Sequence, residues 1–421
     1  MRVSPDTRRR WAALGLCRKT KEDSEGEHVI HAFALLLSLL VQASAVAEEP
    51  IRIGVSGPFT GGSNPMGLAM LNGIRIAASE INADGGVLGR PIELVERDDE
   101  ARNELGARIA QELIRDDRVV AAVGIVNTGV ALASQRFYQQ ARIPVITSVA
   151  TGSLVTKQFT PPQYPHNYVF RVSANDTLQA EMIVQEAVDR SGFRRVAIFH
   201  DSTNYGHLGR DDLQRALARR NIKPVLVERF DIGDVDMTPQ LRRARAAGAE
   251  VLLTYGIGPE LAHIANGRVA LDWDVRMVGS WTLSMSNFID NAGPNAEGAR
   301  MPQTFIAEPV SERIRSFLER YRQVTGNERI PVPPAAAQGY DSLLLLAAAI
   351  RQAGNTEGHA IREALENLHR KVEGVVMDYY LPFTYSDHEA IKGDHIPFVG
   401  RIEQGRVVFA YEDDRRRASR R

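Results

Sequence analysis

Apolar and polar residues follow one another along the chain in two series of short apolar runs and longer amphipathic segments. Each apolar run in the first series has four to six residues, and each longer segment carries apolar residues three or four positions apart. Short apolar runs predict buried strands, and the wider spacing predicts helices. In the first series we predict strands at 51–55, 91–96, 119–123 and 144–147, and helices at 68–81, 103–115 and 129–140.

The second series restarts the same alternation. Its strands are predicted at 195–199, 224–227, 251–254 and 277–279, and its helices at 177–190, 207–220, 238–247 and 260–271. Strands that alternate with helices of this length indicate parallel sheets covered by helices on both faces. Two series favour two similar lobes over one wide sheet. Three later helices, at 312–325, 335–351 and 361–369, lack the strands for a third lobe and must pack on the first two. The predicted fold class is therefore α/β, with two doubly wound parallel-sheet lobes.

Residues 1–47 have the pattern of an export leader. Basic residues at 8–10 and 18–21 precede an apolar run at 32–41, and small residues at 43–47 precede Glu48. This order is typical of a secretory signal peptide, and we predict cleavage after Ala47 and a periplasmic location. The apolar run is about half as long as the ~20 residues that span a bilayer.

Composition narrows the classes of partner. The chain has 421 residues, which favours two domains, and its net charge is −1. Removal of residues 1–47 makes the net charge about −3 and removes the single cysteine, Cys17. A near-neutral chain lacks the basic surface that nucleic acid or anionic membranes attract. The five arginines of residues 413–421 lie beside acidic residues, and we expect a disordered, solvated basic tail there rather than a nucleic-acid site.

The common catalytic motifs are absent from the sequence. It contains no G-x-x-x-x-G-K-[ST], G-x-G-x-x-G, G-x-S-x-G or H-E-x-x-H pattern. The pairs Asp387-His388 and Asp394-His395 resemble a metal cluster, but the residues between them favour a turn. The carboxylates at 98–100 are better explained as the turn after a strand. We therefore expect a binding protein rather than an enzyme, with no cofactor and no metal.

Polar residues follow two successive predicted strands of the first lobe. Asn127 and Thr128 come after the strand at 119–123, and Ser148 and Thr151 come after the strand at 144–147. In open α/β sheets ligands bind beyond the carboxyl ends of the strands, and helix N-termini favour anions. These side chains could together hold one carboxylate by neutral hydrogen bonds. The alternative for each threonine is a helix N-cap.

Several motifs in order carry a resemblance to a known family. The motifs are Ile53-Gly54-Val55-Ser56-Gly57-Pro58-Phe59-Thr60-Gly61, Ala78-Ser79-Glu80-Ile81-Asn82-Ala83-Asp84-Gly85-Gly86-Val87-Leu88-Gly89, Ile92-Glu93-Leu94-Val95-Glu96-Arg97-Asp98-Asp99, Val196-Ala197-Ile198-Phe199-His200-Asp201 and Ala296-Glu297-Gly298-Ala299. With them, residues 51–408 resemble the periplasmic solute-binding proteins of ABC importers, in the Leu/Ile/Val-binding family. The resemblance is specific for the family and says little about the ligand.

The resemblance implies two lobes joined by three crossovers, near 171–175, 302–306 and 395–397. Lobe 1 would comprise 48–172 and 304–395, and lobe 2 would comprise 173–303 and 396–412. It also implies that the lobes close on a ligand and that the closed protein then docks to a membrane permease, as a monomer. The predicted function is thus capture of a small carboxylate-bearing solute for an ABC importer. The alternative is a ligand sensor of the same fold that feeds a regulator or chemoreceptor.

Four residues match the family's ligand-binding positions. Thr128 and Thr151 match the hydroxyl positions, and Val149 matches a residue that contributes backbone groups. Tyr205 matches an aromatic residue that the second lobe brings onto the ligand. The threonines are the same two that strand-end geometry selects independently.

Two positions depart from the family pattern. An acidic residue that pairs with the α-ammonium of amino-acid ligands is expected at the position of Trp281, and an aromatic wall residue is expected at Ile257. A buried ammonium without a carboxylate loses a charge-assisted hydrogen bond of roughly 1.5–3 kcal/mol. We therefore hypothesise that the ligand keeps a carboxylate but need not be an α-amino acid, so that an aromatic or aliphatic acid fits as well. In the alternative, Trp281 is a core residue and Glu260 or Asp201 holds the ammonium.

Overall fold

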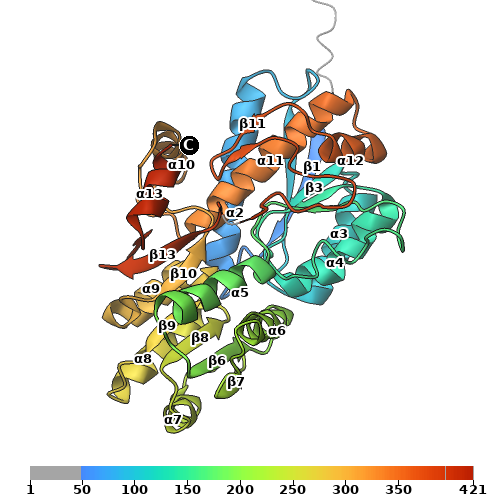
Figure 1. Cartoon of the computed structure of the whole chain (residues 1–421). Coiled ribbons are helices and arrows are strands. Elements are labelled where there is room, and N and C mark those ends of the chain that lie inside the picture. Colours follow the sequence, from blue (N-terminus) through green and yellow to red (C-terminus); the bar gives the residue numbers. More distant parts are fainter. Residues whose placement is uncertain (1–48, 394, 421) are drawn as a thin grey trace, which may run out of the picture. The chain divides into compact units, whose positions relative to one another are not determined.

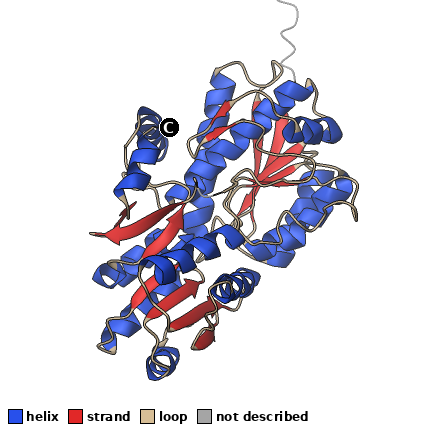
Figure 2. Cartoon of the chain, in the orientation of Figure 1, coloured by secondary structure: helices blue, strands red, loops and turns tan. Residues whose placement is uncertain are grey.

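The computed structural model describes residues 49–393 and 395–420, and these contain two large sheets flanked by helices (Figures 1 and 2). The leader predicted at 1–47 lies outside the described residues. The first sheet has the strand order β2-β1-β3-β4-β5. All of its neighbouring strands are parallel. The bounds are β1(Ile51–Gly57), β2(Ile92–Asp98), β3(Ala121–Gly124), β4(Val145–Thr147) and β5(Val169–Arg171).

The helices that accompany this sheet come from both ends of the chain. They are α2(Asn64–Ala83), α3(Asn103–Arg115), α4(Thr128–Ala141), α10(Glu312–Thr325), α11(Pro333–Ala353) and α12(Gly358–Glu366). Helices α2 and α11 approach backbone to backbone. A Cβ at Gly73 would lie 2.0 Å from the carbonyl oxygen of Ala336, and a Cβ at Gly339 would lie 2.4 Å from that of Met70. Only glycine fits at these two positions of close approach.

The second sheet has the order β14-β13-β10-β9-β8-β6-β7. Its strands are β6(Val196–Asp201), β7(Leu226–Phe230), β8(Val251–Tyr255), β9(Arg276–Gly279), β10(Arg300–Gln303), β13(Phe398–Glu403) and β14(Arg406–Phe409). Strands β6 to β10 are parallel, and β13 and β14 add to the edge in antiparallel fashion. Its helical segments are α5(Asp176–Val184), the π-helical turn η1(Gln185–Arg190), α6(Asn204–Ala218), α7(Thr238–Ala246), α8(Gly258–Ala270), η2(Trp281–Ser284), α9(Ser286–Ala292) and η3(Gly293–Ala296). A small sheet pairs β11(Val372–Glu373) with β12(Asp378–Tyr379).

The chain passes between the two sheets three times: after β5, after β10 and before β13. These passages fall at the crossovers expected at 171–175, 302–306 and 395–397. The residue limits of the two lobes stay a prediction. One predicted strand, at 224–227, is displaced towards the C-terminus in β7. This edge strand alternates half-buried and exposed residues before the buried Phe230, and it includes the polar Glu228 and Arg229.

The C-terminal tail differs from the expected disorder. Residues Glu412–Ser419 form α13, with three acidic residues in the first turn and Arg416 and Arg417 in the last, which suits the helix dipole. Asp414 accepts a hydrogen bond from the backbone N–H of Val399 at 3.1 Å, and Ala418 is buried. The tail is therefore held on β13 by contacts that its charged composition does not reveal. Arg421 lies outside the described residues.

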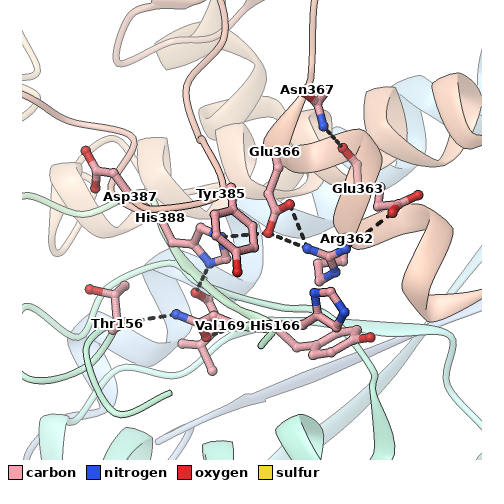
Figure 3. Close-up of polar contacts among 12 residues, drawn as sticks. Thr156, His166, Val169, Arg362, Glu363, Glu366, Asn367, Tyr385, Asp387 and His388 are labelled. Atoms are coloured by element: carbon pink, nitrogen blue, oxygen red, sulfur yellow. Dashed lines mark hydrogen bonds and ion pairs between the residues drawn. The ribbon is translucent and has the colours of Figure 1, made fainter. Parts of the chain in front are cut away.

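The segment that leads to the third passage is fixed to β5 by buried polar groups. Arg171 pairs with Glu389, with an Nε–Oε2 distance of 2.8 Å. The backbone N–H of Arg171 donates to the carbonyl oxygen of His388, and its carbonyl oxygen accepts from the N–H of Ala390. Figure 3 shows the neighbouring His388 directed at Glu366, which also pairs with Arg362 on α12. The His388 Nε2–Glu366 Oε1 distance is 3.1 Å. These ion pairs hold the returning chain against the first sheet.

Candidate functional site

A cavity of about 570 Å³ lies at the carboxyl ends of strands from both sheets. The first sheet contributes the chain after β1, β2, β3 and β4, and the second sheet contributes the chain after β6, β8 and β9. The lining residues are Met66, Ala101, Arg102, Asn103, Glu104, Val126, Asn127, Thr128, Gly129, Thr151, Ser202, Thr203, Asn204, Tyr205, His207, Ile257, Trp281 and Thr282. Both the volume and the strand-end location are typical of a small-molecule site.

The first wall is the N-terminus of α4. The N-cap is Asn127, with an extended backbone and no capping bond from its side chain, and Thr128 is the first helical residue. The oxygen of the Thr128 hydroxyl accepts a hydrogen bond from the backbone N–H of Gly152 at 3.2 Å. This bond joins the two strand-end turns. Because Asn127 occupies the N-cap position, the N-cap alternative for Thr128 does not apply. A hydroxyl that accepts one bond can still donate its proton.

Thr151 lines the same cavity from the turn after β4 and is 4% exposed. Its carbonyl oxygen accepts the backbone N–H of Asp176 at the start of α5. Burial raises the pKa of Asp176 to about 7, against the lowering effect of hydrogen bonds from Thr151 and Tyr255. Thr151 therefore joins the cavity wall to the first passage between the sheets.

The second sheet contributes aromatic and apolar walls. Tyr205 lies in the first turn of α6, and its ring is 5.0 Å from that of Tyr255. The preceding turn is fixed by Asp201, whose Oδ1 accepts bonds from Thr203 and from the N–H of Gly206. Burial raises the pKa of Asp201 to about 6, although these hydrogen bonds lower it. Ile257 precedes α8 and lines the cavity.

Trp281 completes this wall at the end of β9 and is 7% exposed. Its backbone N–H donates to Gln179 Oε1 at 3.3 Å, and its carbonyl oxygen accepts from Gln303 Nε2 at 3.0 Å. Both glutamines are buried. Within the described part of the chain, the indole N–H of Trp281 has no hydrogen-bond partner.

The cavity has few charged groups. Among the described residues that line it, the one carboxylate is that of Glu104, and its side chain is exposed, as is that of Arg102. The two carboxylates proposed as alternative partners of an ammonium do not line the cavity. Asp201 holds its own turn, and Glu260 accepts the backbone N–H of Gly233 at 2.8 Å. The described walls therefore offer mostly neutral hydrogen-bonding groups.

Six of the seven predicted site residues line this one cavity: Asn127, Thr128, Thr151, Tyr205, Ile257 and Trp281. Val149 is fully buried and does not line it, so a backbone contribution from Val149 stays a prediction. Ser148 also points elsewhere, because its hydroxyl donates to Ser342 of α11 at 2.8 Å.

Sequence reasoning missed several lining residues. Ser202, Thr203 and Asn204 follow β6 directly, and Met66 and Asn103 lie near the starts of the helices that follow β1 and β2. The strand-end rule that selected Thr128 applies to all of them. The same rule, applied to every strand end rather than to two of them, selects these residues from the sequence.

The two halves of the protein, each built on one of the two large sheets, contact each other near the cavity. The side-chain amide of Asn287 on α9 donates to the carbonyl oxygen of Gly62 at 3.0 Å. A Cβ at Gly129 would lie 2.4 Å from Oδ1 of Asn103 and 2.9 Å from Oδ1 of Asn204 on α6. The two halves thus meet closely around the cavity.

Neither a metal-binding cluster nor a membrane-spanning helix is found in the described residues. No cluster of three or more His, Cys, Asp or Glu residues in the described ranges could hold a metal ion. In the same ranges, no helix combines the length and apolar character needed to cross a bilayer.

Comparison with known proteins matches residues 50–394 to the family described as periplasmic binding protein. An amino acid binding protein of Pseudomonas aeruginosa is 30% identical over 227 residues, which is 54% of this chain and 59% of that protein. The leucine-, isoleucine-, valine-, threonine- and alanine-binding protein of the same species is 25% identical over 76% of this chain and 83% of its own length.

A solved structure supports the fold. The solute-binding protein of an ABC transporter from Rhodopseudomonas palustris, in complex with 3,4-dihydroxybenzoic acid, matches with a TM-score of 0.73 and 21% identity. The match covers 85% of this chain and 95% of that one. The predicted fold class, α/β with two lobes built on parallel sheets, is confirmed.

Proposed function

Because the chain belongs to the periplasmic binding protein family, we propose that it is the extracytoplasmic solute-binding protein of an ABC importer. It captures a small carboxylate-bearing solute between its two lobes and delivers it to a membrane permease. The observation that carries the proposal is the cavity between the two sheets, where hydroxyl groups and a helix N-terminus converge with no buried carboxylate among the lining residues.

The carboxylate of the ligand would bind at the N-terminus of α4. The first N–H groups of a helix have no partner within the helix, and its dipole favours negative charge. Thr128 adds a hydroxyl donor beside these N–H groups. The Thr151 hydroxyl would join it by exchanging its hydrogen bond to Asp176 for one to the ligand. Hydrogen bonds to a charged group contribute about 1.5–3 kcal/mol each, so this wall would supply most of the polar affinity.

The remainder of the ligand would lie against Tyr205, Ile257 and Trp281. These side chains form an apolar and aromatic surface that suits a branched aliphatic group or a ring. The relatives carry names for both kinds of ligand, since one is named for leucine, isoleucine, valine, threonine and alanine and one structure holds a dihydroxybenzoic acid. The proposed ligand is therefore a branched-chain amino acid or an aromatic or aliphatic acid.

Closure would couple binding to delivery. The contacts between Asn287 and Gly62, and between the starts of α4 and α6, join the two halves around the cavity. A ligand that touches both lobes would stabilise their closed arrangement over an open one. The permease would then recognise the two lobes in their closed positions, with one protein molecule per docking event.

Mass spectrometry of the native protein, followed by calorimetric titration, tests the proposal. We expect a retained small acid after purification from the periplasm, and a dissociation constant of about micromolar or below for that acid. Thr128→Ala and Thr151→Ala should each weaken its binding by about 1–3 kcal/mol. The proposal fails if neither amino acids nor aromatic or aliphatic acids bind, and the carboxylate site fails if both variants bind as the native protein does.

A further inference from the structure

Asp176 connects the wall of the ligand cavity to the second sheet. Its backbone N–H donates to the carbonyl oxygen of Thr151 at 2.8 Å, and its side chain accepts a hydrogen bond from the Thr151 hydroxyl. On its other side, Oδ1 of Asp176 accepts from the hydroxyl of Tyr255 on β8 at 2.8 Å. Thr151 lines the cavity, and Asp176 begins α5 after the first passage between the sheets. The carboxyl of Asp176 is therefore one hydrogen bond away from a hydroxyl proposed to bind the ligand.

The charge of this carboxyl is poorly compensated. Asp176 is completely buried, and burial raises its pKa to about 7. The charge of Arg171 lowers this pKa, but the guanidinium is already engaged elsewhere. It pairs with Glu389 at 2.8 Å and donates to the carbonyl oxygen of Gly152 at 2.7 Å. A proton on Asp176 thus relieves the cost of a buried charge.

The groups that face Asp176 from α6 and β8 do not stabilise its charged form further. Asp212 on α6 raises the pKa of Asp176 by its negative charge, and it is itself paired with Arg215 at 2.6 Å. Burial raises the pKa values of Tyr205 and Tyr255 well above their usual range, so both stay neutral. Near neutral pH, the group in this cluster that exchanges a proton is Asp176.

The hydroxyl of Thr151 has a single proton to donate. While Asp176 is ionised, that proton is directed at the Asp176 carboxylate. Once Asp176 is protonated, its own O–H can donate to the oxygen of Thr151, and the proton of Thr151 becomes available to the ligand. The ligand carboxylate and the Asp176 carboxylate therefore compete for one donor, and a proton on Asp176 ends the competition.

We infer that Asp176 is a positioning residue for Thr151, and that the ligand carboxylate binds together with one proton on the Asp176 carboxyl. This inference rests on the proposed function and deepens it. The proton comes from the solvent and returns to it when the ligand leaves. Because the carboxyl ionises in the free protein and stays protonated in the complex, binding should be tightest at low pH. Affinity should fall as pH rises through the pKa of the free protein.

Calorimetric titration of the native protein tests the uptake of a proton. The probes are leucine, benzoate and 4-methylpentanoate, which keep their charge between about pH 6 and pH 8, and the tightest binder is used. The dissociation constant should rise about tenfold over this range. Titrations in phosphate and in Tris at about pH 7.5 should differ in enthalpy by the uptake of about half to one proton per ligand. Tight binding without proton uptake would overturn the inference and leave the proposed function intact, whereas no binding by any probe would remove both.

Asp176→Asn imitates the protonated carboxyl. Its amide N–H can donate to Thr151, and its carbonyl oxygen can accept from Tyr255. At pH 8 this variant should bind the probe about as tightly as the native protein does at pH 6, without proton uptake. The variant retains His207, another titratable residue of the cavity lining. Proton uptake that persists in Asp176→Asn would therefore assign the proton to another group and refute the role of Asp176.

Asp99→Asn is the matched control. Burial also raises the pKa of Asp99 to about 7, but this residue does not line the cavity, so the variant should keep the native proton uptake. If Asp176→Asn does not fold, two substitutions of Thr151 decide the question. Thr151→Ser keeps the hydroxyl and should keep the uptake, whereas Thr151→Val should lose most of it. Equal uptake in these two variants would refute the coupling.

Discussion

Replacing Gly152 with alanine tests whether the two strand-end turns hold the ligand as one unit. The added Cβ would lie 2.3 Å from Cγ2 of Thr128 and 3.0 Å from its Oγ1. Carbon atoms in unstrained contact are about 3.5–4.0 Å apart, so one of the turns must retreat by roughly 1 Å. The same movement breaks the bond from the Gly152 N–H to Thr128 Oγ1.

The size of the effect follows from these contacts. Overpacking of a buried site costs about 1–3 kcal/mol, and a displaced hydroxyl loses a bond to a carboxylate of about 1.5–3 kcal/mol. We expect Gly152→Ala to weaken binding of the retained acid by about 10–100-fold. Calorimetry measures the dissociation constant, and a thermal unfolding scan confirms that the variant is folded.

Gly62→Ala is the matched control, since Gly62 does not line the cavity. A Cβ there would meet no described atom closer than Cγ of Pro259, at 3.9 Å. Binding should therefore stay within about twofold of the native value. If folded Gly152→Ala binds its acid as tightly as Gly62→Ala does, the turns do not act together and the carboxylate site is misplaced.

Three other perturbations have defined outcomes. Asn287→Ala removes the bond to Gly62 and should speed ligand dissociation about two- to tenfold in stopped-flow traces, without lowering the melting temperature of the ligand-free protein. Asn266→Ala is the control, because its amide bonds within the second lobe, and it should leave the dissociation rate unchanged. Equal dissociation rates for the two variants would show that the bond between Asn287 and Gly62 does not hold the lobes around the ligand. Burial raises the pKa of Asp99 from 3.8 to about 7, so the folded state retains a proton that the unfolded chain releases, and stability should fall as pH rises from about 4 to 7. Asp99→Asn should flatten this decline in thermal scans, and an unchanged slope would contradict the assignment. Glu389→Gln leaves a buried guanidinium without its ion partner and should cost about 3–5 kcal/mol in urea unfolding; a loss below 1 kcal/mol would show that the pair is not important for stability.

Much of the fold was predictable because its signals are local. The strand β1 is a short apolar run, and the turn after β3 carries Asn127 and Thr128 directly at the strand end. Local patterns of this kind specify strands, helices and the edge of the sheet where ligands bind. They identified Thr128 and Thr151 without any knowledge of the family.

The features that could not be predicted depend on residues far apart in the chain. The bond between Asn287 and Gly62 joins positions 225 residues apart. The tail helix forms because Asp414 meets the backbone of Val399, and the charged tail alone favours disorder. Trp281 entered the site through the family resemblance, but its two glutamine partners are visible only in three dimensions.

The packing of α2 on α11 also constrains the order in which the protein can fold. Gly73 of α2 meets the backbone of Ala336, although all five strands of the first sheet end by Arg171. The second sheet is likewise complete only when β13 pairs with β10. Contacts of such long sequence separation slow folding, because the loop must close before the contact forms. We therefore expect neither sheet to become stable until the residues beyond 330 are available, so the chain gains its two halves together rather than one after the other.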